Sequence, residues 1–557
     1  MMFASFASHR VIAAGVLLAL AAARAGADAY PRQPIDVQHY DVDIEFGEDF
    51  AFEATVRVDV RLLSAATEVH LDFEGPTVVA VTTEGQALPY RHDAGRLGVT
   101  LPPTALPGHV LPLTVHYRGQ PDGVALVARP NAHGDPALFA DNWPEGARRW
   151  LPAVDHPSDK ATVDFAITAD DRFGAVAPGE LVETRTLPDG RRLTRWSAPV
   201  AIPAYCMVVG LAEFQVTRVG TADGIPLSVW AFPPDADVTG RMFARSVLMM
   251  EYYADLLGPY PYSKLAQVQS TIRYAGMENA SAIFYAETEL QGPHVDEFPV
   301  AHEIAHQWWG NSVTPADWDD LWLSEGFATY FDALFYEHIE GPEALRRRMR
   351  RGAQRLVARQ AGRPGAIVDP DVTDPQEKLT PLVYQKGAWV LHMLRRQVGD
   401  EAFFRGVREF YRRHAGANAT TADLRVVFEA ATGDSLEAFF RQWLLRTGMP
   451  DLRVTWAWEE ATGEVLVQVE QVQDGEPYHA PLDLAFLGPG GAETRTMTLA
   501  EARDVARFPL PEAPSGVQVD PDGWLLHEAA VTAAPPAAPG LSRDTNGPAP
   551  PSSGGQP

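Results

Sequence analysis

Two histidines four residues apart, His302 and His306, are the residues of this sequence best suited to bind a metal ion. Their neighbours predict a helix, and side chains at this spacing share one helix face about 5–6 Å apart. Glu325 follows after 18 intervening residues, enough for a loop and the start of a second helix that brings a carboxylate back. Two histidines and one glutamate leave a coordination position open for water, as in catalytic zinc sites. The sequence therefore predicts one zinc ion held by these three side chains.

Glu303 follows His302 directly and can reach a metal-bound water without being a ligand itself. Zinc lowers the pKa of its water to about 7, and a carboxylate can then accept the proton during attack and return it to the leaving group. We expect Glu303 to be the general base of a hydrolytic reaction. Asp332, two turns after Glu325, could accept a hydrogen bond from a ligand imidazole, or could equally be a helix-face carboxylate with no metal role.

The composition excludes several other kinds of site. Cys206 is the only cysteine among 557 residues, so neither an intramolecular disulfide nor a cysteine-rich zinc site can form. The formal net charge of −27 argues against nucleic acid as a partner, because binding to phosphates requires clustered Lys and Arg. The apolar fraction of 46% is typical of globular proteins. Nothing in the sequence indicates an oligomeric state.

The first 27 residues have the pattern of an export signal. His9 and Arg10 precede an apolar run over residues 11–23, and Ala25 and Ala27 form an A-x-A cleavage site. The run is shorter than the ~20 residues that a membrane-spanning helix needs. We therefore expect an exported protein, periplasmic or secreted, with no stable membrane span after cleavage; a retained N-terminal anchor is the alternative.

Hydrophobic periodicity divides the remaining chain into four segments. Residues 28–232 alternate apolar and polar positions, which predicts a β-rich N-terminal domain. The spacing becomes helical over 233–449, the predicted catalytic domain, and alternation returns over 450–528, which predicts a small β-sandwich. Residues 529–557 are mostly Ala, Pro, Gly and Ser and predict a disordered tail. The fold class is thus α+β with several domains. Long helices are expected near 297–310, 321–339, 384–398 and 436–446.

Several short motifs carry a resemblance to a known family. In chain order they are Gly276-Met277-Glu278-Asn279, His302 to His306, Trp308-Trp309-Gly310-Asn311, Trp322 to Ala328 and Tyr384-Gln385-Lys386-Gly387. Together they closely resemble the aminopeptidase N family of gluzincin metallopeptidases, over about residues 30–450. The resemblance implies a saddle-shaped N-terminal β-domain and a thermolysin-like α/β catalytic domain with a helical C-terminal lobe. Only about a hundred residues follow Pro450, so the chain looks like a compact bacterial-type member without the large C-terminal helical domain of many relatives.

The resemblance also implies roles for individual residues. Glu278 looks like the carboxylate that holds the free α-ammonium group of the substrate, in a segment where the Gly276 and Met277 backbone lines the peptide like an added strand before Asn279. Such an anion near the metal favours peptides that begin there. Tyr384 resembles the family tyrosine whose hydroxyl donates a hydrogen bond to the developing oxyanion.

One departure concerns a further contact to the substrate amine. Family members commonly place Gln or Glu on an N-terminal-domain loop for this purpose, and that position falls at Trp143 here. Asp141 or Glu145 could replace it, although both could be ordinary loop carboxylates.

The sequence thus predicts a zinc-dependent aminopeptidase that acts on peptides with a free N-terminus. The main alternative is an endopeptidase of the wider zincin group, which would share the metal ligands but have no use for Glu278. A chain that has lost catalysis and serves as a peptide-binding module is a further alternative. Epoxide hydrolysis, known from one branch of the family, is not suggested by any feature of this sequence.

Overall fold

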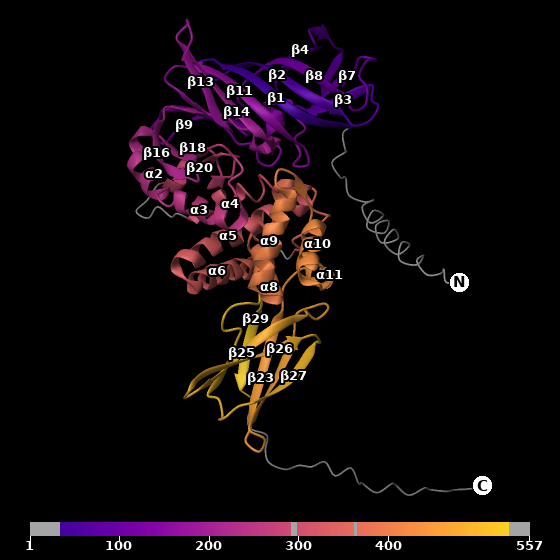
Figure 1. The fold of residues 1–557 in the computed structure, drawn as a ribbon, viewed down its shortest axis with the longest axis vertical. Coiled ribbons are helices and arrows are strands. Elements are labelled where there is room, and N and C mark those ends of the chain that lie inside the picture. The colour runs from indigo at the N-terminus through magenta and orange to yellow at the C-terminus, as the bar shows by residue number, and fades with distance from the viewer. Residues whose placement is uncertain (1–33, 291–297, 361–364, 534–557) are drawn as a thin grey trace, which may run out of the picture. The chain divides into compact units, whose positions relative to one another are not determined.

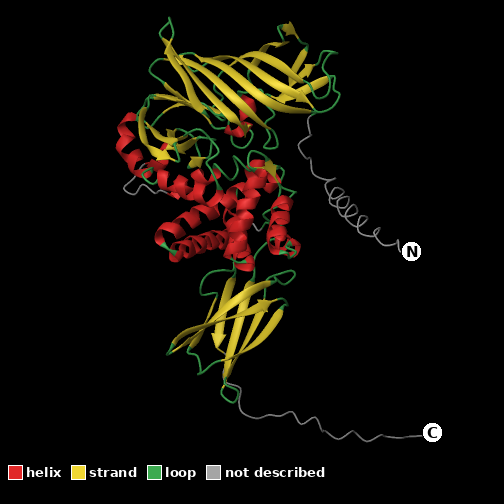
Figure 2. Cartoon of the chain, viewed as in Figure 1, coloured by secondary structure: helices red, strands yellow, loops and turns green. Residues whose placement is uncertain are grey.

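The computed structural model describes residues 34–290, 298–360 and 365–533, and it separates into two compact units, Met1–Thr447 and Gly448–Pro557 (Figure 1). The predicted signal segment, residues 1–27, lies outside the described residues. Strands form most of the first part of the chain and of the second unit, and helices dominate the segment between them (Figure 2). The predicted α+β class, with a β-rich N-terminal part and a helical region, is therefore confirmed.

An eight-stranded sheet forms the largest part of the N-terminal domain, in the order β13-β14-β11-β1-β2-β8-β4-β5. Buried and exposed side chains alternate along its central strands, so one apolar face packs inward, and Val42, Val56 and Val58 are fully buried. The strands are β1 (Ile35–Phe46), β2 (Phe52–Leu62), β4 (Thr77–Thr83), β5 (Gln86–Ala87), β8 (Val110–Gly119), β11 (Lys160–Asp170), β13 (Glu180–Thr186) and β14 (Arg191–Pro203).

Two smaller sheets complete this domain. The first has the order β3-β7-β6, with β3 (Glu68–Asp72), β6 (Tyr90–Asp93) and β7 (Arg96–Thr100). The second has the order β12-β15-β10-β9, with β9 (Leu126–Pro130), β10 (Pro136–Ala140), β12 (Gly174–Val176) and β15 (Gly210–Ala212). The loop that carries Asp141 and Trp143 begins where β10 ends.

A five-stranded sheet with the order β16-β17-β18-β20-β19 leads into the helical region. Its strands are β16 (Gln215–Ala222), β17 (Ile225–Ala231), β18 (Leu265–Ser270), β19 (Gly276–Met277) and β20 (Ala282–Ala286). The sequence predicts residues 215–231 as the last strands of the N-terminal domain; in the structure β17 pairs in parallel with β18, so these strands join the sheet that continues toward the helical region. Alternation identifies a strand, whereas the sheet that it joins depends on pairing with distant residues. β19 is an edge strand.

Helices build most of the rest of the first unit, together with one short strand pair, β21 (Thr314–Pro315) and β22 (Asn418–Ala419). The helices are α2 (Ala236–Met242), α3 (Ser246–Leu257), α4 (Phe298–His306), α5 (Trp322–Glu340), α6 (Pro342–Gln360), α7 (Pro375–Lys378), α8 (Gly387–Val398), α9 (Asp400–His414), α10 (Thr421–Thr432) and α11 (Glu437–Leu444). A π-helical turn, Leu382–Lys386, precedes α8. α4 ends at His306, earlier than the expected residue 310, because the next amides bond three residues back and Gly310 has a left-handed φ of 103°.

Gly326 of α5 and Gly387 of α8 allow these two helices to pack closely. A Cβ at position 326 would lie 2.9 Å from the Cα of Gly387, and backbone atoms cannot move aside as a flexible side chain can. We expect Gly326→Ala to lower the free energy of unfolding by about 1–3 kcal/mol, measured by thermal and urea unfolding. Gly240→Ala is the matched control, because Gly240 is helical with open space around it. Equal effects of the two substitutions would contradict the close-packing account.

The second unit contains two sheets, in the orders β27-β24-β23-β29 and β26-β25-β28. Their strands are β23 (Asp451–Glu459), β24 (Glu464–Gln471), β25 (Ala480–Gly488), β26 (Gly491–Leu499), β27 (Arg503–Pro509), β28 (Gly516–Val519) and β29 (Glu528–Ala533). Residues 529–533, expected in the tail, instead form β29, because backbone pairing with β23 holds an alanine-rich segment in place. The rest of the predicted tail, 534–557, lies outside the described residues. Among the described residues, no helix combines the length and apolar character needed to cross a membrane.

Candidate active site

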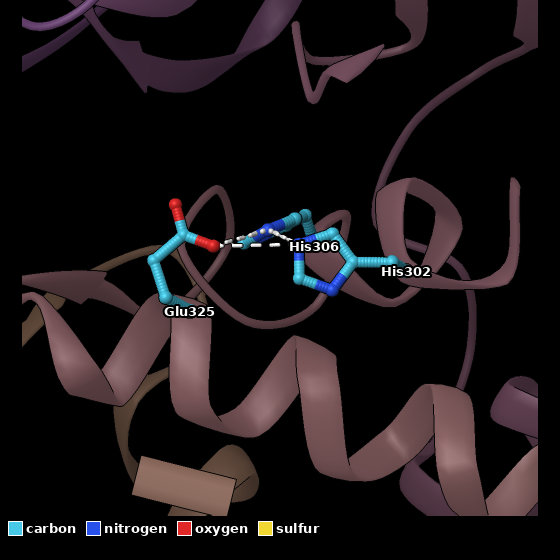
Figure 3. Close-up of side chains that lie close together, drawn as sticks. All are labelled: His302, His306 and Glu325. Atoms are coloured by element: carbon cyan, nitrogen blue, oxygen red, sulfur yellow. Dashed lines mark hydrogen bonds and ion pairs between the residues drawn. The ribbon is translucent and has the colours of Figure 1, made fainter. Parts of the chain in front are cut away.

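Helices α4 and α5 pack together and bring His302, His306 and Glu325 to one point (Figure 3). The two Nε2 atoms are 3.0 Å apart, and each lies 3.3 Å from Oε2 of Glu325. All three side chains are largely buried, with exposed fractions of 14%, 1% and 5%. The spacing in the sequence thus led to the correct expectation that these three groups lie together.

The loop after α4 sets the orientation of the His306 ring. Its Nδ1 lies 2.9 Å from the backbone carbonyl oxygen of Trp309 and 3.1 Å from Oγ of Ser324. A carbonyl oxygen can only accept, so Nδ1 carries the proton and donates it, which leaves a lone pair on Nε2 in the neutral ring. Gly310 belongs to this loop, and a Cβ there would collide with Ser324, 2.2 Å away.

Asp332, which the sequence suggested as an acceptor for a ligand imidazole, has a different contact. Its Oδ2 accepts a hydrogen bond from Nη1 of Arg348 on α6 at 2.8 Å. For His306 the accepting group is instead the carbonyl of Trp309. Sequence reasoning missed it because a backbone carbonyl leaves no trace in residue identity.

The three converging groups fit a metal cation. Two imidazole nitrogens and a carboxylate oxygen all offer lone pairs to the same small space, and only a shared positive charge satisfies them together. The electrostatics agree: burial lowers the pKa of His306, but the carboxylates of Glu325 and Glu278 overcome this and raise it to about 10. Burial raises the pKa of Glu325, yet the neighbouring imidazoles reverse the shift and hold it at about 2. The two groups of possible ligands found among the described residues contain no cysteine, and this His–His–Glu set suits zinc.

Glu303 lies beside the His302–His306–Glu325 group and against strand β19. Its carboxylate, that of Glu278 and a ring nitrogen of His306 lie within 4.8 Å of one another. Burial raises the pKa of Glu303 well above its usual range, and His306 opposes the shift. A Cβ on Gly276 would lie 2.2 Å from Oε1 of Glu303, so the backbone of this edge strand directly contacts the carboxylate.

Glu278 is a buried carboxylate just beyond the end of β19, 4% exposed. Its backbone carbonyl accepts hydrogen bonds from Nε2 of Gln307 at 2.9 Å and Nδ2 of Asn311 at 2.6 Å. Its Oε1 has no hydrogen-bond partner within the described ranges. Burial raises the pKa of this carboxyl to about 7, against the opposing effect of His306. Next to it, the backbone N–H of Asn279 donates to the backbone carbonyl of Met277 at 2.8 Å and closes a tight turn. A cationic group is the natural complement of this oxygen.

Tyr384 lies in the π-helical turn Leu382–Lys386, a rare local geometry that is frequent at functional sites. Its ring is 6.1 Å from the ring of His302, at an interplanar angle of 24°. Burial and the carboxylate of Glu325 raise the pKa of its hydroxyl well above the usual value. The hydroxyl therefore keeps its proton and can act as a donor.

Asp141 and Glu145, the two candidates for a further contact to the substrate amine, have different partners in the structure. Glu145 accepts from Nε1 of Trp318 at 3.2 Å and pairs with Arg148 at 3.1 Å, so both of its oxygens are engaged. Asp141 is 2% exposed, and Arg273 lies 3.6 Å from its Oδ2. Its Oδ1 has no hydrogen-bond partner in the part of the chain that the structure describes. Asp141 is therefore the better candidate of the two, while the Trp143 ring packs against the rings of Tyr205 and Trp318.

The sequence did not predict that the side-chain amides of Gln307 and Asn311 would donate to the backbone carbonyl of Glu278. Gln307 directly follows His306, and Asn311 ends the Trp-Trp-Gly-Asn motif. The only signal was that Asn311 lies inside a motif and Gln307 between two of them; the contacts themselves depend on the tertiary fold.

Comparisons with known proteins identify the family to which this architecture and site belong. Residues 36–206 match the Peptidase M1 N-terminal domain, and residues 242–443 match the Peptidase family M1 domain. The chain belongs to the aminopeptidase N family of zinc metallopeptidases.

Three curated relatives illustrate the similarity. "Probable aminopeptidase 2" of Sulfurisphaera tokodaii is 26% identical over 445 residues, which cover 76% of this chain and 55% of the relative. "Aminopeptidase N" of Streptomyces lividans is 27% identical over 449 residues, 75% of this chain and 51% of the relative. "Aminopeptidase N" of Lactococcus lactis subsp. lactis is 29% identical over 328 residues, 55% of this chain and 38% of the relative. The chain thus spans about half the length, or less, of these relatives.

Proposed function

We propose that the protein is a zinc-dependent aminopeptidase, which removes the first residue from peptides with a free N-terminus. The observation that carries the proposal is the placement of Glu278, Glu303 and His306 in one buried cluster, with their ligand atoms within 4.8 Å. A buried anion so close to a general base and a metal ligand leaves room for little more than one residue between the substrate amine and the scissile bond. The names of the curated relatives support the same activity.

Each side chain of the site has a defined task in this proposal. His302, His306 and Glu325 hold one zinc ion, which when bound lowers the pKa of water and polarises the carbonyl of the substrate. Glu303 accepts a proton from the attacking water and returns it to the departing amine.

The remaining residues bind and orient the peptide. Glu278 pairs with the α-ammonium group, and Tyr384 donates a hydrogen bond to the oxygen that becomes negative in the transition state. The free edge of β19, at Gly276 and Met277, offers backbone groups to an extended peptide, and the turn at Asn279 ends this strand where the amine binds.

The same proposal includes the identity of the domains and the export of the protein. The eight-stranded sheet serves as the saddle of the N-terminal domain, and the helical region as a thermolysin-like catalytic domain with its helical lobe. The two sheets after Gly448 form a β-sandwich. The signal-like residues 1–27 support export to the periplasm or the exterior.

The function is tested with one peptide in two forms, with a free and with an acetylated N-terminus, and the products are identified by mass spectrometry. We expect release of the first residue from the free-amine form alone. In Glu278→Gln, loss of the charge-assisted contact should lower kcat/KM for this form by about 10–100-fold. Internal cleavage of the acetylated peptide would instead support the endopeptidase alternative. Binding of the free peptide without cleavage would support the peptide-binding module.

A further inference from the structure

A chain of hydrogen bonds connects the N-terminal domain to Glu278, and Asn311 is its centre. The Nδ2 of Asn311 donates to the carbonyl of Glu278 at 2.6 Å, and its Oδ1 accepts from the thiol of Cys206 at 3.3 Å. The carbonyl of Glu278 can only accept, so it fixes the NH2 end of the amide toward Glu278 and leaves Oδ1 to accept from the thiol. Asn311 is fully buried, as is Cys206, so water does not compete for these contacts.

A second N-terminal-domain side chain holds the backbone of the same loop. Lys160 of β11 donates through Nζ to the carbonyls of Asn311 and Ser312, at 3.0 and 2.9 Å. Tyr205, next to Cys206, donates to the carbonyl of Gly310 at 3.1 Å. Three N-terminal-domain side chains thus bind three consecutive residues, 310–312, of the loop that follows the ligand helix α4.

We propose that Asn311 is the positioning residue for the amine-binding carboxylate Glu278, and that Cys206 and Lys160 of the N-terminal domain hold Asn311 in place. The inference rests on the proposed function, because it assumes that Glu278 binds the substrate amine. Glu278 lies just past a two-residue edge strand, whose own pairing is too short to fix it. The side-chain amides of Asn311 and Gln307 supply that restraint from the opposite side. The N-terminal domain therefore helps to determine amine recognition through the buried contacts of Cys206 and Lys160 with Asn311.

The test uses two hydroxamate inhibitors that bind the metal and differ only in the presence of an α-amine. Wild-type protein should bind the amine-bearing compound more tightly than its des-amino analogue. Asn311→Ala should reduce that preference by about 10-fold, the value of one buried hydrogen bond, and should raise KM for a free-amine aminoacyl anilide. Affinity for the des-amino compound should not change. Cys206→Ala should also reduce the preference for the amine-bearing hydroxamate. Cys206→Ser, whose hydroxyl can still donate to Asn311, should keep the wild-type preference.

Asn418→Ala is the matched control, because Asn418 also donates its amide to an N-terminal-domain carbonyl, that of Pro157 at 2.7 Å, but does not contact Glu278. A purely structural effect lowers the folded fraction and hence the apparent kcat, without changing KM or the inhibitor preference, and this is the result expected for Asn418→Ala. The same pattern in Asn311→Ala would overturn the inference. If wild-type protein itself does not distinguish the two hydroxamates, the proposed function fails instead.

Discussion

Glu303→Gln lowers kcat by about 10²–10⁴-fold in our account, the usual contribution of a positioned general base, while zinc remains bound. The amide keeps the size of the side chain beside Gly276 but cannot accept a proton from water. Since the proposal assigns zinc to His302, His306 and Glu325 and not to Glu303, metal content should stay at that of the wild type. Steady-state kinetics and metal analysis of the same preparation measure both quantities.

Glu287→Gln is the control for this substitution. Glu287 is also a buried carboxylate, 8% exposed, but it accepts a hydrogen bond from the backbone N–H of Ala132. It belongs to neither group of converging ligand atoms. Its replacement should leave kcat within about twofold of the wild type. A Glu303→Gln protein with normal turnover would rule out Glu303 as the base.

Tyr384→Phe should reduce kcat by about 10²–10³-fold, the effect of removing one oxyanion donor, with little change in KM. The charge that the hydroxyl stabilises develops only in the transition state, so binding of the ground state is spared. The raised pKa keeps the hydroxyl protonated throughout the neutral pH range. Tyr117→Phe removes a buried hydroxyl that donates to Trp150 in the N-terminal domain, and it should affect stability without affecting kcat. Equal kcat in wild type and Tyr384→Phe would refute the donor role.

The sequence predicted those parts of the site that depend on spacing along one helix or between two adjacent helices. His302 and His306 share a helix face by local geometry, and Glu325 returns to them because α5 packs on α4. The orientation of His306, in contrast, depends on the carbonyl of Trp309, and that of Glu278 on the amide of Asn311. Neither contact can be read from periodicity, because each requires the tertiary path of a loop.

Two features of the fold depend on the same kind of long-range contact. Alternation predicts β16 and β17 as strands, but it does not predict which sheet they join. That depends on the parallel pairing of β17 with β18, which brings together residues about forty positions apart. Composition predicts a tail at residues 529–533 because their side chains can bury little apolar surface, yet the backbone of β29 pairs with β23. Composition and alternation report local preference, and both cases were decided by long-range hydrogen bonding.

A titration of zinc into metal-free protein tests the central claim most directly, with release of the first residue from a free-amine peptide as the readout. The account predicts no release without metal and a linear rise that ends at one zinc ion per chain. It also predicts that His306→Ala cannot be activated at the same zinc concentrations, because one of its three ligands is missing. Release by the metal-free protein, or full activation of His306→Ala, would contradict a site built from His302, His306 and Glu325.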